Sequence, residues 1–258
     1  MKPLPRIMIG KHGISRLIVG GNPFSGNSHQ STRLSKEMRD YYTAEKIKET
    51  LRECERCGIN TVQARGDSHI MRVLNEYWNE GGQLQWIAQT ASEMASVQSN
   101  INQIASCGAI ACYHHGSKTD SLFREGRIDS VKDTLAFIKD KGMPAGLGTH
   151  DPEVIRYAED HNFDADFYMM CFYNISKRGD VYLPEDRELA CLVIREVDKP
   201  VLAFKIMAAG RNEPREAFKY ACENIKPIDA VVIGMFTKYH PDQVQEDANL
   251  ARNSFLPS

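Results

Sequence analysis

Short apolar runs alternate with amphipathic helical stretches along the chain, and this alternation restricts the fold more than any other feature. Most of the runs are apolar almost throughout, which is typical of parallel strands covered on both faces. A strand-then-helix unit that repeats eight times in 258 residues predicts an α/β fold, a (β/α)8 TIM barrel, in one domain over residues 1–258. The expected strands cover residues 13–21, 58–63, 84–89, 108–115, 143–149, 165–172, 199–207 and 229–235.

The intervening helices have recognisable ends. The stretch 43–58 begins at Thr43, a residue that caps helices, and ends at Gly58, where a left-handed backbone can stop one. Pro152 follows the capping residue Asp151, in the first turn, where the missing N–H of proline costs nothing. A doubly wound sheet is the alternative fold, but no G-x-G-x-x-G follows a strand.

Two connections are longer than the usual two to six residues. Residues 22–42 follow the first expected strand, and residues 173–188 follow the sixth. Long loops at the carboxyl ends of barrel strands are often lids or binding loops, so we expect either role here. The alternative is an extra surface helix or an oligomer contact.

Composition favours a small-molecule partner. The formal net charge is −2, with 32 basic and 34 acidic residues interspersed, so nothing indicates binding to nucleic acid or to an anionic membrane. The first residues lack an apolar stretch of signal-peptide length, and no run approaches the ~20 apolar residues of a membrane span. We therefore expect a cytoplasmic protein. The seven cysteines are expected to be reduced, and Cys54-x-x-Cys57 lies in a helical stretch where packing explains it better than a metal or redox role.

Polar side chains follow most of the expected strands. In a barrel the carboxyl ends of all strands converge on one face, so these side chains should share a pocket suited to a hydroxy-carbonyl or sugar-like compound. The candidate substrate-binding residues are Asn22, Gln63, Arg65, Gln89, Cys171, Tyr173 and Asn174.

Adjacent histidines end the fourth expected strand. Neighbouring strand residues point to opposite faces, so only one of His114 and His115 can enter the barrel. We favour His115 because Gly116 follows it and allows a ligand to approach closely. Three roles are open for the pair: an acid/base or hydrogen-bonding histidine, a metal ligand, or a structural pair. A metal site needs about three protein ligands, and the only candidates to join one of these histidines are His150, Asp67 and Asp151. We therefore predict no metal.

Lys205 lies among apolar neighbours in the seventh expected strand. Removal from water disfavours a charged ammonium, which is how nucleophilic lysines arise. Binding of a substrate anion, covalent catalysis and structural pairing are the three alternatives. Cys171 could be a nucleophile, although a buried cysteine usually acts as a small apolar side chain.

Several segments resemble the aldo-keto reductase superfamily. Residues 7–26 resemble its N-terminal hairpin and first strand, residues 58–60 its second strand, residues 173–178 the end of its sixth, and residues 233–251 its last strand and cofactor-phosphate helix. The resemblance implies a TIM barrel, a nicotinamide cofactor and a catalytic tetrad of Asp, Tyr, Lys and His.

The chain departs from that tetrad. Gln63 stands where the resemblance implies the aspartate, and Gln89 where it implies the lysine. The implied tyrosine is missing, since residues 64–73 contain none. Only the histidine has a counterpart, in His114 or His115. The implied nicotinamide-binding residues read Gly148-Thr149 and Met170. The fold therefore transfers better than the activity.

Three functions follow. The leading hypothesis is acid/base chemistry of an isomerase, epimerase or lyase, with His115 as acid or base, His150 assisting, and Lys205 and Arg65 stabilising an oxyanion. The first alternative is an NADP-dependent oxidoreductase with a rebuilt proton relay, in which Lys238 faces the 2′-phosphate. The second is a ligand-binding barrel without catalysis. No cofactor is predicted by the leading hypothesis.

Overall fold

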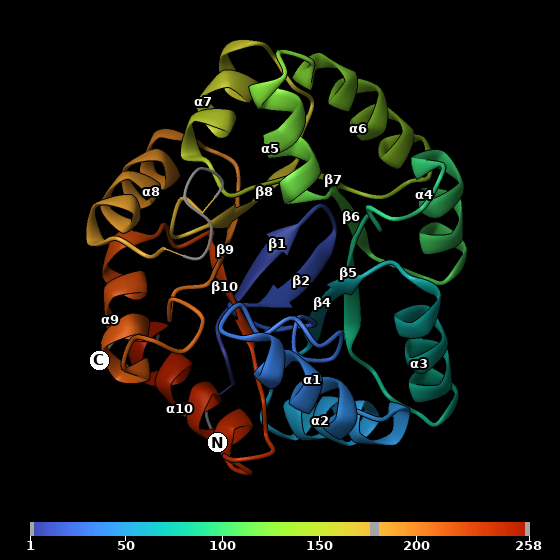
Figure 1. Ribbon diagram of the computed structural model, residues 1–258, viewed down its shortest axis with the longest axis vertical. Helices are drawn as coiled ribbons and strands as arrows, with labels where there is room; N and C mark the ends of the chain where they lie inside the picture. The colour runs from blue at the N-terminus through green and yellow to red at the C-terminus, as the bar shows by residue number, and fades with distance from the viewer. Residues whose placement is uncertain (1–2, 176–180, 256–258) are drawn as a thin grey trace.

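Eight parallel strands close into a barrel in the order β10-β3-β4-β5-β6-β7-β8-β9, with helices around it (Figure 1). The computed structural model describes residues 3–175 and 181–255. Each predicted apolar run supplies one barrel strand, so the predicted α/β (β/α)8 fold is confirmed. The strands are β3 (Leu17–Gly20), β4 (Thr61–Arg65), β5 (Gln85–Gln89), β6 (Ala111–His114), β7 (Ala145–Thr149), β8 (Phe167–Cys171), β9 (Val201–Phe204) and β10 (Ala230–Gly234).

A two-stranded hairpin closes the amino-terminal end of the barrel and crosses its middle in Figure 1. It consists of β1 (Arg6–Ile9) and β2 (His12–Ser15), which pair antiparallel. Its isoleucines pack in one apolar cluster with side chains such as Ile18 and Phe167 at the starts of barrel strands. The first predicted strand was therefore too long, because its first three residues belong to the hairpin.

The strand predicted over residues 199–207 ends earlier, at Phe204. Lys205 follows with φ 61°, and Ala208 and Ala209 also have positive φ, so the chain cannot remain extended. A turn replaces the strand, with the Ala208 N–H donating to the Lys205 carbonyl at 2.8 Å. Lys205 thus lies just beyond β9, so the prediction that it lies inside the strand was wrong.

Helices cover the outside of the barrel. As predicted, the Thr43 side chain caps α2 and Gly58, with φ 82°, follows its end, while Asp151 caps α7 with Pro152 in its first turn. The helices are α2 (Ala44–Arg56), α3 (Ser68–Asn79), α4 (Val97–Ser106), α5 (Gly116–Arg124), α6 (Val131–Asp140), α7 (Pro152–Asp160), α8 (Pro184–Glu196), α9 (Pro214–Asn224) and α10 (Gln243–Phe255), with a 3-10 turn at Ile128–Ser130.

The two long connections are partly helical. Residues 22–42 contain α1 (Thr32–Tyr41), which Ser31 caps by accepting a hydrogen bond from the Leu34 N–H. In the stretch 173–188, residues 176–180 lie outside the described residues, and α8 begins at Pro184. A lid role for either connection stays a prediction.

Cys54 and Cys57 both pack in the apolar core around α2. Burial raises the pKa of the Cys54 thiol, and burial with the nearby Glu53 raises that of Cys57 to about 11, so both are protonated thiols at neutral pH. Across residues 3–175 and 181–255, no three His, Cys, Asp or Glu side chains are grouped to hold a metal ion. In the same residues no helix has the length and apolar character needed to cross a bilayer.

Candidate active site

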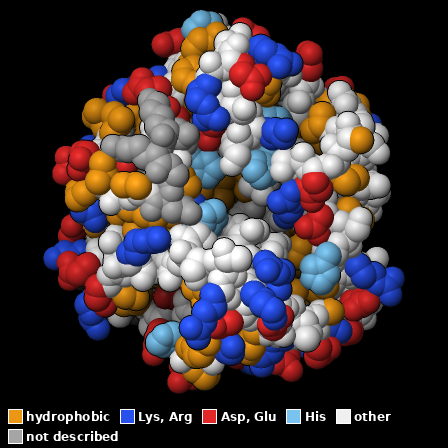
Figure 2. All heavy atoms as spheres, in the orientation of Figure 1, with side chains coloured by type: hydrophobic (Ala, Val, Ile, Leu, Met, Phe, Trp, Pro, Cys, Tyr) orange, Lys and Arg blue, Asp and Glu red, His pale blue; other side chains and the backbone are white. Residues whose placement is uncertain are grey.

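A cavity of about 750 Å³ opens at the carboxyl ends of the barrel strands. This is the end at which TIM-barrel enzymes carry their catalytic residues. Figure 2 shows the hollow near the centre of this face, with histidine side chains at its rim. Seven of the candidate residues line the cavity together: Asn22, Gln63, Arg65, Gln89, His115, His150 and Lys205.

The other candidates lie outside the cavity lining. Cys171 is buried, and burial raises the pKa of its thiol to about 12. The Tyr173 hydroxyl accepts a hydrogen bond from the Asn212 amide at 2.7 Å, and Asn212 does line the cavity. Asn174 is buried. Lys238 is exposed, with its ammonium 3.8 Å from a Glu37 oxygen and over the ring of Tyr239.

The two adjacent histidines have different surroundings. His114, the last residue of β6, is buried away from the cavity, and its Nδ1 lies 2.8 Å from Thr119 Oγ1. His115 lines the cavity, and its Nδ1 is buried without a hydrogen-bond partner among the described residues. Burial lowers the pKa of both imidazoles to about 4, with Arg65 adding to the effect at His115. Both are therefore neutral at pH 7.

The Asp120 carboxylate contacts the His150 imidazole from outside the cavity lining. Its Oδ2 lies 2.8 Å from His150 Nδ1, and its Oδ1 accepts a 2.6 Å hydrogen bond from Thr149 Oγ1. Asp120 is on α5 and buried, whereas His150 directly follows β7 and lines the cavity. Sequence analysis missed Asp120 because helix residues were not searched. The useful signal would have been its position four residues after Gly116, on the first turns of the helix that starts at the histidine pair.

Tyr113 lies at the bottom of the cavity and was also missed. Its hydroxyl accepts a hydrogen bond from the Gln63 amide at 2.8 Å, and burial raises the pKa of the phenol, which stays protonated. Strand alternation could have identified it, since Tyr113 and His115 are two residues apart and share a face.

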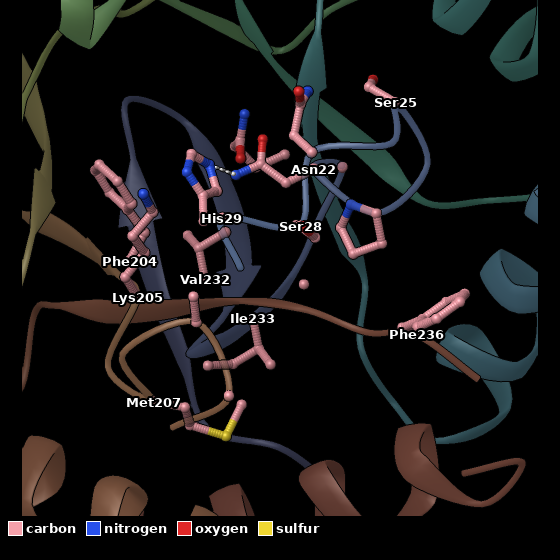
Figure 3. Close-up of a pocket in the computed structure, with 18 of the residues that line it drawn as sticks. Asn22, Ser25, Ser28, His29, Phe204, Lys205, Met207, Val232, Ile233 and Phe236 are labelled. Carbon is pink, nitrogen blue, oxygen red and sulfur yellow. Dashed lines mark hydrogen bonds between the residues drawn. The ribbon is translucent and has the colours of Figure 1, made fainter. Parts of the chain in front are cut away.

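The loop after β3 contacts the loop after β9 at one side of the cavity mouth, since only β10 separates these two strands. Gln30 Nε2 donates to the Ala209 carbonyl at 2.6 Å, and the Arg211 guanidinium donates to the His29 carbonyl at 3.2 Å. Figure 3 shows Asn22 and His29, joined by their 3.4 Å contact, in the same close-up as Lys205 at the end of β9. The Lys205 ammonium is shielded from solvent. These contacts hold the two loops together beside the cavity.

Arg65, the last residue of β4, is held by acidic and hydroxyl groups. Its guanidinium makes a two-point ion pair with the Glu93 carboxylate and donates to Ser92 Oγ at 3.1 Å. Because Glu93 neutralises much of its charge, Arg65 is a weaker anion-binding group than its position alone suggests.

Glycines form the wall of the cavity where β3 meets β10. Gly20 and Gly234 are paired in register, and Gly21 follows β3. A Cβ atom at Gly234 would lie 2.9 Å from Pro23 Cδ, so a side chain there would press on the neighbouring cavity wall. The first residue of α10, Gln243, lies further along the same cavity.

Comparison with known proteins gives a match at the level of structure. No protein-family model and no curated protein matches the chain. A Pseudomonas aeruginosa protein assigned to the aldo-keto reductases superposes with a TM-score of 0.67 at 14% identity, covering 98% of this chain and 94% of its own. The fold is that of the aldo-keto reductases.

Two further solved structures show the same similarity. A Bacillus halodurans aldo-keto reductase in its holo form gives a TM-score of 0.64 at 12% identity, covering 98% of this chain and 93% of its own. A Gluconobacter oxydans glycerol dehydrogenase gives 0.54 at 11% identity, covering 98% and 97%.

These neighbours correct the leading functional hypothesis. They are reductases and a dehydrogenase, so the prediction of an isomerase, epimerase or lyase was wrong, and the oxidoreductase alternative is better supported. The prediction was wrong because it equated the missing tetrad with a lack of redox chemistry, and because polar strand ends suggested acid/base chemistry instead. Polar side chains such as His150, held by Asp120, can accompany either chemistry.

Proposed function

We propose that this chain is a nicotinamide-dependent oxidoreductase of small carbonyl compounds or the matching alcohols, with a rebuilt proton relay. One observation carries the proposal: a single elongated cavity joins a glycine-lined wall to a wall of hydrogen-bonded histidine and tyrosine side chains. The first wall presents backbone to a bound ring, and the second can exchange protons. The reductase and dehydrogenase neighbours of the same fold support this choice.

The cavity suits a dinucleotide in its size and lining. It extends from Tyr113 at the barrel centre to Gln243 at the start of α10, and it includes the aromatic side chains of Phe236 and Tyr239. Amide groups of Asn22 and Gln243 could hold ribose and phosphate oxygens, while the nicotinamide ring would lie against the backbone at Gly20 and Gly234. Bound there, the cofactor supplies the hydride that the carbonyl carbon receives.

The residues around the substrate position differ from the implied tetrad. Gln63 and Gln89 replace the acidic and basic members, and both are hydrogen-bonding amides that line the cavity. They can orient a carbonyl oxygen but cannot give it a proton. The proton would then come from a histidine, from Tyr113 or from Lys205, all of which line the cavity.

Titration with the nicotinamide cofactors tests this proposal. We expect NADPH or NADH to bind the purified protein with a Kd in the micromolar range, measured by the fluorescence of the reduced nicotinamide. Gly234→Val should weaken that binding at least about tenfold, because the new side chain would displace Pro23, which lines the cavity. Gly13→Val, at the closed end of the barrel where a Cβ meets only Met8 Sδ at 3.8 Å, is the matched control and should bind normally.

The outcomes separate the remaining alternatives. Failure of both cofactors to bind at millimolar concentration would refute the oxidoreductase. Binding without turnover on any small aldehyde, ketone or alcohol would instead support the non-catalytic ligand-binding barrel.

A further inference from the structure

We infer that His150, oriented by Asp120, is the catalytic residue that gives a proton to the carbonyl oxygen of the substrate. The inference rests on the proposed oxidoreductase function and assigns its proton relay to residues of this chain. Asp120 is then a positioning residue, since it acts through His150 and does not line the cavity.

The Asp120 carboxylate has a fixed position. It is 3% exposed and receives hydrogen bonds from the Thr149 hydroxyl at 2.6 Å and from the His150 backbone N–H, which lies 3.2 Å from each oxygen. These donors fix the orientation of the carboxylate independently of its 2.8 Å contact with His150 Nδ1. The imidazole therefore meets a carboxylate whose orientation does not depend on ligand binding.

This contact determines how His150 can exchange a proton. A carboxylate accepts but does not donate, so Nδ1 carries a hydrogen and Nε2 is the nitrogen that takes up or releases a proton. The carboxylate also stabilises the imidazolium form that donates. Because His150 lines the cavity, that proton is available to a bound substrate.

Neighbouring residues fix the plane of the ring. The Phe204 ring packs edge-to-face on it, with centroids 5.3 Å apart. A Cβ atom at Gly116 would lie 3.3 Å from His150 Cε1, so the absence of a side chain there lets the ring sit against the start of α5. The ring is thus held on three sides by Asp120, Phe204 and Gly116.

Other side chains in the cavity suit proton donation less well. His115 lacks a carboxylate partner among the described residues and is neutral at pH 7, since burial lowers its pKa to about 4. The Tyr113 phenol is buried under Gln63, and its raised pKa makes it a weak acid. Both are better suited to hydrogen-bonding the substrate.

The proposed step balances in protons and electrons. The carbonyl carbon gains a hydride, the carbonyl oxygen gains the Nε2 proton, and the products are an alcohol, oxidised cofactor and neutral His150. Solvent then returns a proton to Nε2. In the alcohol-oxidising direction, neutral His150 accepts the hydroxyl proton.

Nitrogen NMR of the cofactor-free protein tests the orientation directly. With 15N-labelled imidazoles, His150 should show a protonated Nδ1 and an unprotonated Nε2 when neutral, with its resonance assigned by its loss in His150→Gln. In Asp120→Asn this tautomer preference should be lost. A His150 protonated at Nε2, or one unaffected by Asp120→Asn, would overturn the inference whatever the activity.

Kinetics test the chemical role. NADPH and NADH oxidation would be followed with glyceraldehyde, 4-nitrobenzaldehyde and pyruvate. We expect His150→Gln to lower kcat about 10²–10⁴-fold, the usual effect of losing a general acid, with cofactor Kd changed less than about twofold. His161→Gln is the matched control, because that imidazole is exposed, lies outside the cavity lining and contacts Tyr157 through its carbonyl and its ring.

The pH profile separates a catalytic histidine from a structural one. The charged and titratable groups around His150 are Asp120 and His115, and Cys171 interacts electrostatically with both Asp120 and Lys205. The wild type should lose kcat as pH rises and the imidazolium is lost, and His150→Gln should remove that limb. Asp120→Asn should lower kcat at least tenfold and change the pH range over which kcat falls. A normal limb in His150→Gln would refute the inference, whereas a wild type that binds neither cofactor would refute the proposed function instead.

Discussion

The two walls of the cavity differ in what their residues contribute. On the side of β6, β7 and α5, the polar side chains are held by partners behind them: Asp120 holds His150, and the Tyr113 hydroxyl accepts from Gln63. On the side of β3 and β10, Gly20 and Gly234 contribute no side chain. Proton transfer needs groups in fixed positions, which the first side supplies, whereas the second side presents backbone, against which the proposed cofactor ring would lie.

The largest expected effect lies in the packing of the polar wall. A Cβ atom at Gly148 would lie 2.7 Å from the His114 carbonyl oxygen and 2.9 Å from Tyr113 Cδ2, so Gly148→Ala must displace backbone. We expect the free energy of unfolding to fall by about 3 kcal/mol, measured by urea denaturation. Gly13→Ala, with open space around it, should change it by less than about 0.5 kcal/mol. Equal losses in both would show that the polar wall is no more tightly packed than the hairpin.

The buried histidine behind this wall gives the next effect, a dependence of stability on pH. The folded pKa of His114 is about 4 against an ordinary 6.5, so below pH 6.5 the unfolded chain binds a proton that the folded chain does not. Stability is therefore full above pH 6.5 and is lost as pH falls toward 4, by about 2 kcal/mol between pH 8 and 5 for this residue. His114→Gln should lose correspondingly less over that range. Unfolding free energies that fall equally in both proteins would contradict the assignment.

Tyr113, in the polar wall, gives a smaller effect. Tyr113→Phe leaves the buried Gln63 amide without the acceptor that it has at 2.8 Å, which should cost about 1–2 kcal/mol of unfolding free energy. Tyr239→Phe, whose hydroxyl is on an exposed side chain, is the control and should cost less than about 0.5 kcal/mol. If the two substitutions cost the same, the amide has another partner in solution.

The smallest effect concerns Lys238 beyond the glycine wall. If NADPH binds as proposed, with its 2′-phosphate toward Lys238, then Lys238→Gln should weaken NADPH binding about two- to fivefold and leave NADH binding unchanged. The effect is small because the ammonium is exposed and already near Glu37. An equal change for both cofactors would place the 2′-phosphate elsewhere.

Much of the barrel could be predicted from the chain alone. Apolar runs of strand length, separated by helices with Thr43, Gly58 and Asp151 at their ends, are local features, and local sequence controls them. Convergence of strand ends then predicted that Gln63, Gln89, His115 and His150 would meet, and they line one cavity. Sequence analysis failed where the outcome depended on backbone conformation, as at Lys205, where an apolar run continues in the sequence although the strand has ended.

The sequence by itself determined the repeating strand and helix units, and therefore which residues stand at the barrel mouth. Only the tertiary structure decided which of those residues are held by others. Asp120 and His150 are 30 positions apart and belong to different elements, and they meet because α5 packs against β7. The sequence favoured His115 over His114 for the cavity, and His115 does line it, but the contact of His114 with Thr119 depends on how α5 packs, which no local pattern specifies.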